Sequence, residues 1–218
     1  MASHYAGPLV CAWNNSGPRA RRGAPVSIAL GEANARCENH WMIPMGLSRG
    51  GKGNGGGGGR NRSLNERLLR CHEKIRTFLA IAARVAAREG APKERADAAA
   101  DVARYFGSAF FDHAADEDES IFPRLPQELA ALAARAGAEH VRDEPIVRVM
   151  IEECDLISQG VEDEAVYEKL AGVVSELTPR LLEHLTFEED YLIPAVSELD
   201  PALQTAALEE MAQRRDAR

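Results

Sequence analysis

The chain of 218 residues is poor in several features, and each scarcity narrows its possible structure. It has only four cysteines and no Cys-x-x-Cys pair, which favours neither a disulfide framework nor a zinc ribbon and suits a reducing, cytoplasmic compartment. No apolar run approaches the ~18 residues that a membrane span needs, so we expect no membrane partner. An excess of positive charge is lacking beyond residue 60, where acidic residues outnumber basic ones and the net charge is −13 against −8 for the whole chain, and this argues against nucleic-acid binding.

The first sixty residues differ in composition from the rest. They hold 13 of the 18 glycines, and seven basic residues against two acidic ones. Because no stretch has helical or strand periodicity, we predict a disordered Gly-rich extension over residues 1–60. A signal peptide would need a basic start and an apolar core, which this segment lacks, whereas its arginines and few acids leave a transit peptide as an alternative.

Residues 61–218 show the apolar periodicity of helices and contain the residue types that typically start and end them. We expect helices from Ser63 to Gly90, from Pro92 to near Pro123, from Pro126 to about Gly160 and from about residue 162 to just before Pro194, followed by a short C-terminal helix after Asp200. No segment predicts a strand. The expected fold is therefore all-α, an antiparallel up-down four-helix bundle over residues 61–218.

Outside the extension the chain has only four histidines, and three of them have a glutamate four residues later. The pairs are His113 with Glu117, His140 with Glu144, and His184 with Glu188, while His72 stands alone. Residues i and i+4 of a helix lie on one face, so each pair can present a nitrogen and an oxygen to one point. One such pair by itself is more often a surface ion pair.

An internal repeat makes the pattern more specific. The segments 113–123 and 184–194 share a histidine, a glutamate at +4, an acid at +6, an aliphatic residue at +8 and a proline at +10, at an offset of 71 residues. The remaining histidines, His72 and His140, repeat at an offset of 68 residues. The sequence therefore predicts two helical hairpins, each with a lone histidine on its first helix and a His-x-x-x-Glu pair on its second.

Helix geometry brings these histidines to one level. At 1.5 Å per residue, His72 lies about 13 Å beyond Ser63 and His113 about 15 Å before Pro123, and these levels nearly coincide in an antiparallel hairpin. Buried imidazoles need a partner for each ring nitrogen, and a metal ion supplies one. We therefore predict a metal site, with Glu144 as a further candidate, built from His72, His113, Glu117, His140, His184 and Glu188.

The donor types favour one group of metals. If Glu117 and Glu188 both bridge two ions, each ion has two histidines, two carboxylate oxygens and open positions, which suits iron or manganese better than zinc. The Glu-x-x-His motif of ferritin-like proteins does not occur at any of the four histidines. Such a pair of ions would bind small diatomic molecules or peroxide.

The order His72, His113-x-x-x-Glu117, His140, His184-x-x-x-Glu188 resembles the hemerythrin-like (HHE cation-binding) family over about residues 63–195. The resemblance implies a four-helix bundle around two non-haem iron ions, joined by an oxo or hydroxo bridge, with these six residues as ligands. Oxygen-carrying hemerythrins have a fifth histidine where this chain has Glu144. The four-histidine set is more similar to di-iron proteins of nitric-oxide stress and iron–sulfur cluster repair, whose extra N-terminal domain with paired cysteines has no match in residues 1–60.

Three classes of function follow as hypotheses. The first is a di-iron protein that binds O2 or NO for sensing, storage or stress protection. The second is an enzyme that reduces NO or peroxide, or contributes to iron–sulfur cluster repair, and the third is a regulatory or interaction protein that metal merely stabilises. The sequence names neither the physiological ligand nor a redox partner or protein partner.

Other side chains near the predicted ligands are expected to be solvated or to pack in the core, with no role at the metal site. Glu139 and Glu183 each precede a ligand and point about 100° away from it, so a solvated position is favoured over a hydrogen bond to a ligand. The acids from Asp116 to Glu119, apart from Glu117, are also expected in solvent, and Tyr191 is expected in the aromatic core.

Overall fold

All regular structure in the described part of the chain is helical. The computed structural model describes residues 63–217, and no strand occurs among them, which confirms the all-α class. The predicted disordered extension over residues 1–60 lies outside the described residues. Within the described part, no helix combines the length and the apolar character that crossing a membrane requires.

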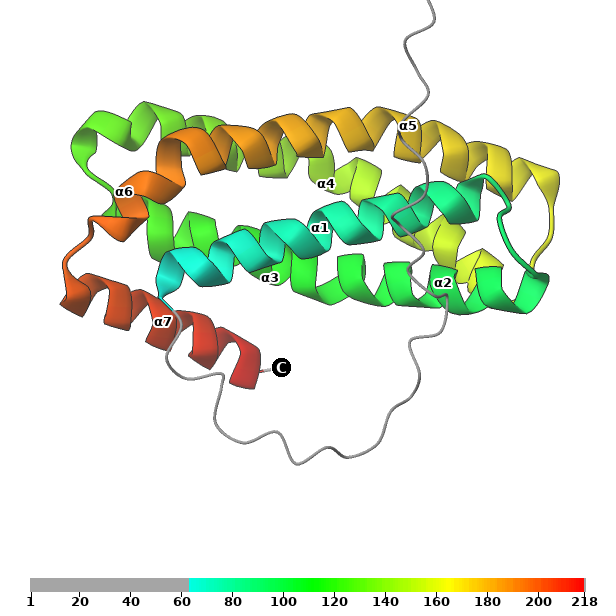
Figure 1. The fold of residues 1–218 in the computed structure, drawn as a ribbon, viewed down its shortest axis with the longest axis horizontal. Helices are drawn as coiled ribbons and strands as arrows, with labels where there is room; N and C mark the ends of the chain where they lie inside the picture. The colour runs from blue at the N-terminus through cyan, green and yellow to red at the C-terminus, as the bar shows by residue number, and fades with distance from the viewer. Residues whose placement is uncertain (1–62, 218) are drawn as a thin grey trace, which may run out of the picture. The chain divides into compact units, whose positions relative to one another are not determined.

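The helices form four long rods and a C-terminal addition (Figure 1). The first rod is α1 (Leu64–Ala86), and the second joins α2 (Pro92–Arg104), η1 (Tyr105–Phe110), α3 (Phe111–Ala115), η2 (Asp116–Ile121) and η3 (Phe122–Arg124). The third consists of η4 (Gln127–Leu129) and α4 (Ala130–Ser158), and the fourth of α5 (Glu164–Phe187) and η5 (Glu188–Leu192). The chain ends in α6 (Ile193–Ser197) and α7 (Pro201–Asp216).

Local sequence signals set the ends of these helices. The Glu66 carboxylate accepts a hydrogen bond from the Ser63 N–H at 3.1 Å, which completes a capping box at the start of α1. Gly90 and Gly160 have φ values of 84° and 87°, a conformation that glycine adopts without strain, and they follow the first and third rods. At the start of α7, the Asp200 carboxylate accepts from the Ala202 N–H at 2.8 Å.

The fourth rod ends where the sequence predicted, because η5 stops at Leu192, just before Pro194. The short helix α6 was not predicted: it begins at Ile193 and includes this proline in its first turn. A proline in a first turn removes an N–H that would have no partner within the helix, so α6 can begin there without losing a hydrogen bond. Figure 1 shows that α6 turns away from the direction of α5.

Two π-helices occur at equivalent places in the internal repeat. η2 begins one residue before Glu117 and η5 begins at Glu188, so both predicted carboxylate ligands lie in widened turns. The repeat also places Pro123 and Pro194 just after these segments, and a proline ring clashes with the carbonyl four residues earlier. Because residues 119 and 190 fall inside η2 and η5, the prolines give a physical reason for the widening.

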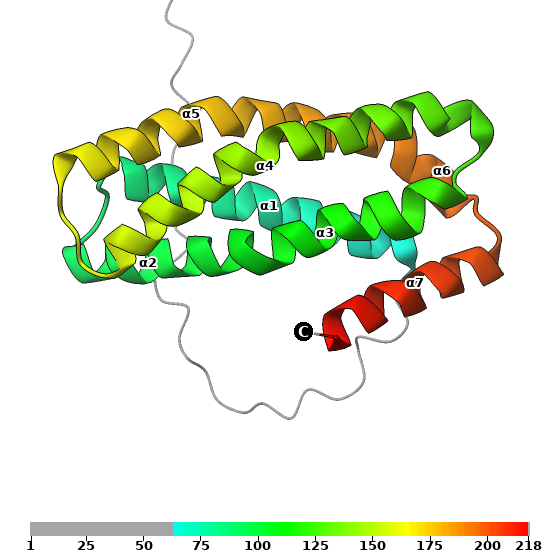
Figure 2. The same cartoon turned by 180° about the vertical axis from the view of Figure 1, so that it is seen from behind.

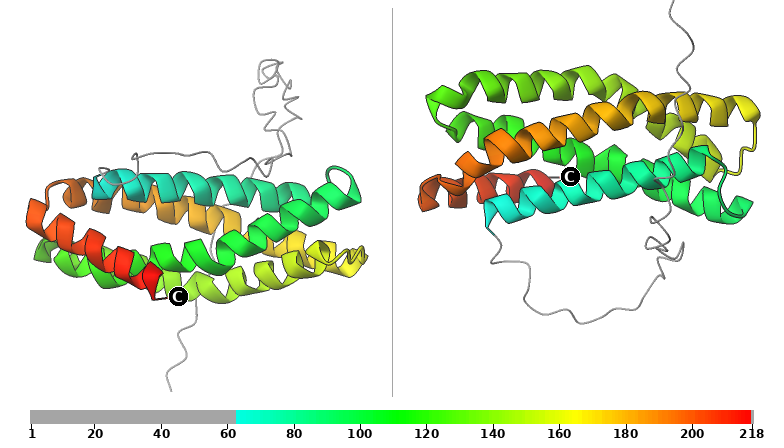
Figure 3. Two further views of the ribbon diagram at one scale, coloured as in Figure 1. Left: turned by 90° about the horizontal axis from the view of Figure 1, so that it is seen from below. Right: turned by 45° about the horizontal axis from the view of Figure 1, so that its top comes forward.

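The four rods lie side by side, and neighbours run in opposite directions (Figures 1 and 2). α1 packs against α2 and α5, and α4 packs against the same two helices. α7 lies along the outside of the rods (Figure 3) and packs against η2. Its buried residues Ala207 and Met211 join Leu64 and Leu68 in an apolar cluster.

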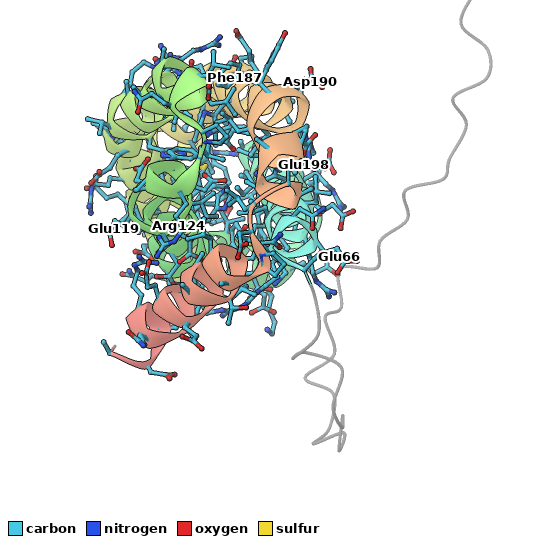
Figure 4. The ribbon with its side chains drawn as sticks, turned by 90° about the vertical axis from the view of Figure 1, so that its left-hand side faces the viewer. Glu66, Glu119, Arg124, Phe187, Asp190 and Glu198 are labelled. Carbon is cyan, nitrogen blue, oxygen red and sulfur yellow. The ribbon has the colours of Figure 1, made fainter. Side chains whose placement is uncertain are left out.

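The apolar core is interrupted where the histidines lie. Along the buried face of α1, Leu64 and Leu68 belong to the cluster shared with α7, whereas Ile75 and Leu79 belong to a larger cluster made with α2, α4 and α5. His72 lies between the two clusters and is fully buried. Viewed along the rods, side chains fill the space that the helices enclose (Figure 4). This interruption of the core is the place of the candidate site.

Candidate metal centre

The structure brings all six predicted ligands together in the interior. His72 comes from α1, His113 from α3, His140 from α4 and His184 from α5, while the two glutamates come from η2 and η5. Their donor atoms form two groups, and within each group all atoms lie within 4.8 Å of one another. The first group is His72, His113, Glu117 and Glu188, and the second is His140, His184 and the same two glutamates. Each hairpin thus supplies the histidine pair of one group, and both groups share the carboxylates.

In the first group, the ring nitrogens face the shared carboxylates. His72 Nε2 lies 3.4 Å from Glu188 Oε2 and 3.8 Å from Glu117 Oε1. His113 Nε2 lies 3.5 Å from Glu117 Oε2. These distances exceed those of good hydrogen bonds and leave space for a cation between the atoms.

The second group is slightly tighter. His184 Nε2 lies 3.2 Å from Glu188 Oε1, and His140 Nε2 lies 3.4 Å from Glu117 Oε2. The Nε2 atoms of His140 and His184 are 3.0 Å apart. Two nitrogens bound at about 2.1 Å to one ion, at right angles, would be roughly 3.0 Å apart, so this separation fits a shared metal ion.

Unpartnered polar atoms support the same interpretation. The atoms His72 Nε2, His113 Nε2, Glu117 Oε2 and both carboxylate oxygens of Glu188 are buried and form no hydrogen bond within the described residues. Burying such groups without partners costs free energy, and native proteins rarely leave them unpaired. Metal ions in the two groups would satisfy all of them, so the residues present fit a pair of cations.

The carboxylates determine where protons bind in the metal-free centre. Burial alone would lower the pKa of His72, but Glu117 and Glu188 outweigh it and raise the pKa to about 10. Burial also opposes charge on His140, whose pKa is nevertheless raised to about 10 by Asp118 and Glu117. Burial would raise the pKa of Glu117, yet the surrounding histidines hold it well below its usual range. A metal ion must therefore displace protons from His72 and His140 rather than from Glu117.

In three of the four histidines, the Nδ1 atom, which is not the one facing the shared carboxylates, forms a hydrogen bond with a further carboxylate. His72 Nδ1 donates to Glu189 Oε1 at 2.9 Å, His140 Nδ1 donates to Asp118 at 3.1 Å, and His184 Nδ1 donates to Glu139 Oε2 at 2.9 Å. Such hydrogen bonds fix the ring orientation and leave Nε2 free for a metal.

Two of these carboxylates, Glu139 and Asp118, were expected in solvent, and the expectation was wrong for Glu139. Glu139 is only 13% exposed and bonds to His184 as well as to Arg135, because α4 turns this face toward α5. Asp118 is 36% exposed, as expected, but its carboxylate also reaches His140 across the bundle. The expectation was wrong for Asp116, which is buried because Arg214 and Arg215 of α7 pair with its carboxylate. Glu183, by contrast, is 78% exposed as expected.

A sequence signal for two of the carboxylates was present. In each copy of the repeat, an acid follows the ligand glutamate directly, and these acids are Asp118 and Glu189. Each reaches the lone histidine of the other hairpin: Asp118 contacts His140 and Glu189 contacts His72. The shared acid at +5 from the histidine therefore carried more information than the acid at +6.

Two further residues lie away from the centre. Glu144 belongs to neither donor group, and its exposed carboxylate instead accepts hydrogen bonds from Arg148, so the structure places this candidate ligand on the surface. Tyr191 was expected in the core but is 56% exposed. It follows the first residues of η5, where the wider turn shifts the later side chains relative to an α-helix.

Comparison with protein families identifies the chain. Residues 63–196 match the hemerythrin HHE cation binding domain. The chain belongs to this family. Comparisons with curated proteins and with solved structures gave no match. The matched residues contain both donor groups and end before α7, so this helix lies outside the part that the hemerythrin HHE family shares.

Membership gives the two donor groups a chemical meaning. The hemerythrin HHE domain binds cations, and the chain presents two buried groups of histidine and glutamate that could hold them. The protein is therefore a metal-binding member of the family.

Proposed function

We propose that the chain holds two iron ions, one in each donor group, with Glu117 and Glu188 as bridging ligands. The observation that carries this proposal is the sharing of both carboxylates by two histidine pairs in a buried site. Imidazole and carboxylate donors together suit iron. We further infer that the four rods form the antiparallel up-down four-helix bundle expected for a hemerythrin-like domain, which agrees with their packing pairs.

We propose that this centre binds O2 or NO for sensing, storage or stress protection. A pair of iron ions supplies a redox-active site at which a diatomic ligand can bind. Each donor group offers two histidine nitrogens and two carboxylates, so an iron ion bound there would keep open positions for a small ligand. The donor side chains are buried, so they keep bulk water away from those positions.

We also propose a reducing, cytoplasmic setting for the protein. The two described cysteines, Cys71 and Cys154, are free thiols rather than a disulfide. Free thiols are the usual state of cysteine in the cytosol.

The decisive experiment is metal analysis combined with spectroscopy. The protein is purified without oxygen, iron is counted per chain, and absorption and Mössbauer spectra are recorded before and after addition of O2 and of NO. We expect about two irons per chain and a new absorption band with at least one of the two gases. Fewer than about two irons per chain, with no gas-dependent band, would contradict the proposal.

The chain offers a matched control for this experiment. Glu117→Ala and Glu144→Ala each remove a glutamate that lies four residues after a histidine, but only the first removes a buried, shared donor. We expect iron and the gas-dependent band to be lost in Glu117→Ala and retained in Glu144→Ala. Steady turnover of NO or peroxide by the wild type, lost only in Glu117→Ala, would instead indicate the enzymatic alternative.

A further inference from the structure

His113 differs from the other three histidines of the centre. Its side chain is buried, and its Nδ1 atom has no hydrogen-bond partner among the described residues, whereas each of the other three Nδ1 atoms donates to a carboxylate. A buried N–H without an acceptor is costly, and this position therefore calls for one.

The internal repeat shows which residue is missing. In the second hairpin, Glu139 directly precedes His140 and accepts the hydrogen bond from His184. The equivalent position in the first hairpin, directly before His72, is Cys71. A glutamate there would face His113 as Glu139 faces His184, so the cysteine leaves His113 without its carboxylate.

In the second hairpin an arginine donates to Glu139, and the first hairpin has an arginine at the equivalent position. Arg135 lies four residues before Glu139 and donates to it at 2.9 Å. The equivalent residue, four positions before Cys71, is Arg67. Arg67 forms no ion pair within residues 63–217. The first hairpin thus keeps the arginine and the histidine of this arrangement and lacks only the acid between them.

A cavity lies at this place. It has a volume of about 250 Å³ and is lined by side chains of α1, η1, α3, η2 and α7, including both Cys71 and His113. Arg67 and Tyr105 also line it, and α7 contributes Met211 and Arg215. One wall of the cavity thus comes from α7, which lies outside the residues that match the family.

The charge around the cavity favours an anion. Its cationic lining residues are Arg67, Arg70, Lys74 and Arg215, and its acidic ones are Asp112 and Asp116. The Asp116 carboxylate already accepts hydrogen bonds from Arg214 and Arg215, so its charge is compensated. Arg70 and Lys74, like Arg67, form no ion pair within the described part of the chain. The lining therefore carries a net positive charge in a domain that is otherwise acidic.

We propose that this cavity binds a small monocarboxylate, whose oxygens accept hydrogen bonds from His113 Nδ1 and from the guanidinium of Arg67. The bound carboxylate takes the place that Glu139 occupies between Arg135 and His184 in the second hairpin. A carboxylate behind a metal-binding histidine fixes the ring and makes it a stronger donor, and such partners change metal affinity by about 10- to 100-fold. The concentration of the carboxylate thereby tunes the centre from a site separate from the open metal positions.

This inference rests on the proposed metal centre in one respect. A metal ion at Nε2 leaves the proton of His113 on Nδ1, which is the tautomer that donates to the carboxylate. In the metal-free chain the carboxylate selects the same tautomer, so binding is expected in both states and is tighter in the iron-loaded one.

The experiment titrates sodium acetate into the full chain, metal-free and iron-loaded, and follows binding by calorimetry and by the ¹⁵N resonances of the histidine rings. We expect one acetate per chain and a shift of the His113 resonance in the metal-free protein. Arg67→Gln should weaken binding by roughly tenfold through loss of a charged hydrogen bond. Lys93→Gln, which removes an exposed cation elsewhere, should leave it unchanged.

Two substitutions at one position provide the sharpest comparison. Cys71→Glu supplies the missing carboxylate from the chain itself, so acetate binding should disappear while the iron content stays the same. Cys71→Ser leaves the cavity open and should retain binding. Acetate that binds equally well to Cys71→Glu and to wild type sits elsewhere, for example on the iron, and overturns the proposal. No saturable acetate binding, or binding of inorganic phosphate in place of acetate, also overturns it.

The outcomes separate this inference from the proposed function. Iron content and gas-dependent spectra are measured on the same preparations without acetate, so a failure of the di-iron centre is visible independently. A metal-free chain that still binds acetate between Arg67 and His113 would keep the carboxylate site even if iron were absent.

Discussion

At the scale of single residues, the candidate centre depends on which group lies behind each histidine. His184 is held by Glu139, which Arg135 holds in turn, and His72 is held by Glu189, which accepts two hydrogen bonds from Arg76. In both cases an arginine near the surface contacts a carboxylate, and that carboxylate contacts a buried imidazole. The rings are therefore oriented before a metal ion arrives, which lowers the cost of binding it.

We predict that Glu139→Gln weakens metal binding. The amide can still accept a hydrogen bond from His184, but it carries no negative charge, and loss of such a partner typically costs about 10- to 100-fold in metal affinity. Competition with a coloured chelator measures the affinity. The control is Glu183→Gln, which changes an exposed glutamate directly before the same histidine. Equal affinities of the two variants would show that the Glu139 contact does not support the centre.

At the scale of elements, α7 forms ion pairs with η2, the segment that carries the proposed bridging ligand Glu117. Arg214 and Arg215 both donate to Asp116, which is buried and directly precedes Glu117 in η2. Arg124 of η3 adds an ion pair to Glu210 of α7. The C-terminal helix thus neutralises a buried charge beside the centre and closes one side of the cavity next to His113.

We predict that the double variant Arg214→Gln/Arg215→Gln loses about 3 kcal/mol of unfolding free energy, because it leaves the Asp116 carboxylate buried without a cation. Urea unfolding at neutral pH measures the loss. Arg104→Gln, which changes an exposed ion pair, should cost less than about 0.5 kcal/mol. Adding Asp116→Asn to the double variant should recover most of the loss, since no buried charge then remains. A double variant as stable as Arg104→Gln would contradict this role of α7.

A second link between elements joins α4 to α5. Asp143 of α4 is buried, and it accepts hydrogen bonds from Arg142 at 2.7 Å and from Arg180 of α5 at 3.3 Å. Burial would raise the pKa of Asp143, but the two arginines outweigh it and lower the pKa. Folding therefore favours the charged carboxylate. Its contribution to stability is present above the ordinary aspartate pKa of about 3.9 and is lost as the pH falls through the lower folded value.

We predict that Asp143→Asn is less stable than wild type by about 1–2 kcal/mol at pH 7 and that the difference shrinks below about pH 4. Urea unfolding of both proteins between pH 7 and about pH 3 measures the difference in unfolding free energy. Release of metal in acid affects both proteins alike. Asp97→Asn, an exposed aspartate paired with Lys93, serves as the control and should show almost no difference at any pH. A constant difference for Asp143→Asn from pH 7 to pH 3 would argue against a charged Asp143.

At the scale of the whole molecule, the buried centre couples metal binding to folding. The donors interrupt the apolar core, so without metal several polar atoms remain buried and unpaired. We predict that chelation lowers the unfolding free energy, by about 4 kcal/mol relative to protein with free iron 1,000-fold above its dissociation constant. Thermal and urea unfolding with and without iron measure the change. A Glu117→Ala/Glu188→Ala variant should show no dependence on iron, and wild-type stability independent of iron would contradict the prediction.

Much of the fold was predictable because its signals are local. The capping box at Ser63, the glycine turns and the aspartate before α7 act within a few residues, and the structure places helix ends there. The π-helices η2 and η5 were missed, and with them the exposure of Tyr191, because a widened turn depends on the balance between a proline clash and packing rather than on periodicity.

The candidate site was predictable in its donors and less so in their support. The repeat identified six side chains that the structure brings into two donor groups, and their binding of metal stays a prediction. The partners of the Nδ1 atoms were not identified, since Asp118 and Glu189 each reach a histidine of the opposite hairpin. A contact between hairpins depends on how the helices are rotated against each other, which spacing along one helix does not specify.

The sequence by itself determined the helical class, the helix ends, the duplicated order of histidines and glutamates, and the cysteine that stands where the second hairpin has a glutamate. Each of these follows from periodicity, capping or repetition within a few turns of one chain segment. Only the tertiary structure decided that His113 lacks a partner, that α7 closes the cavity beside it, and that Glu144 lies outside the centre. These features depend on packing between distant segments, because burial and hydrogen bonding are settled only when the helices meet.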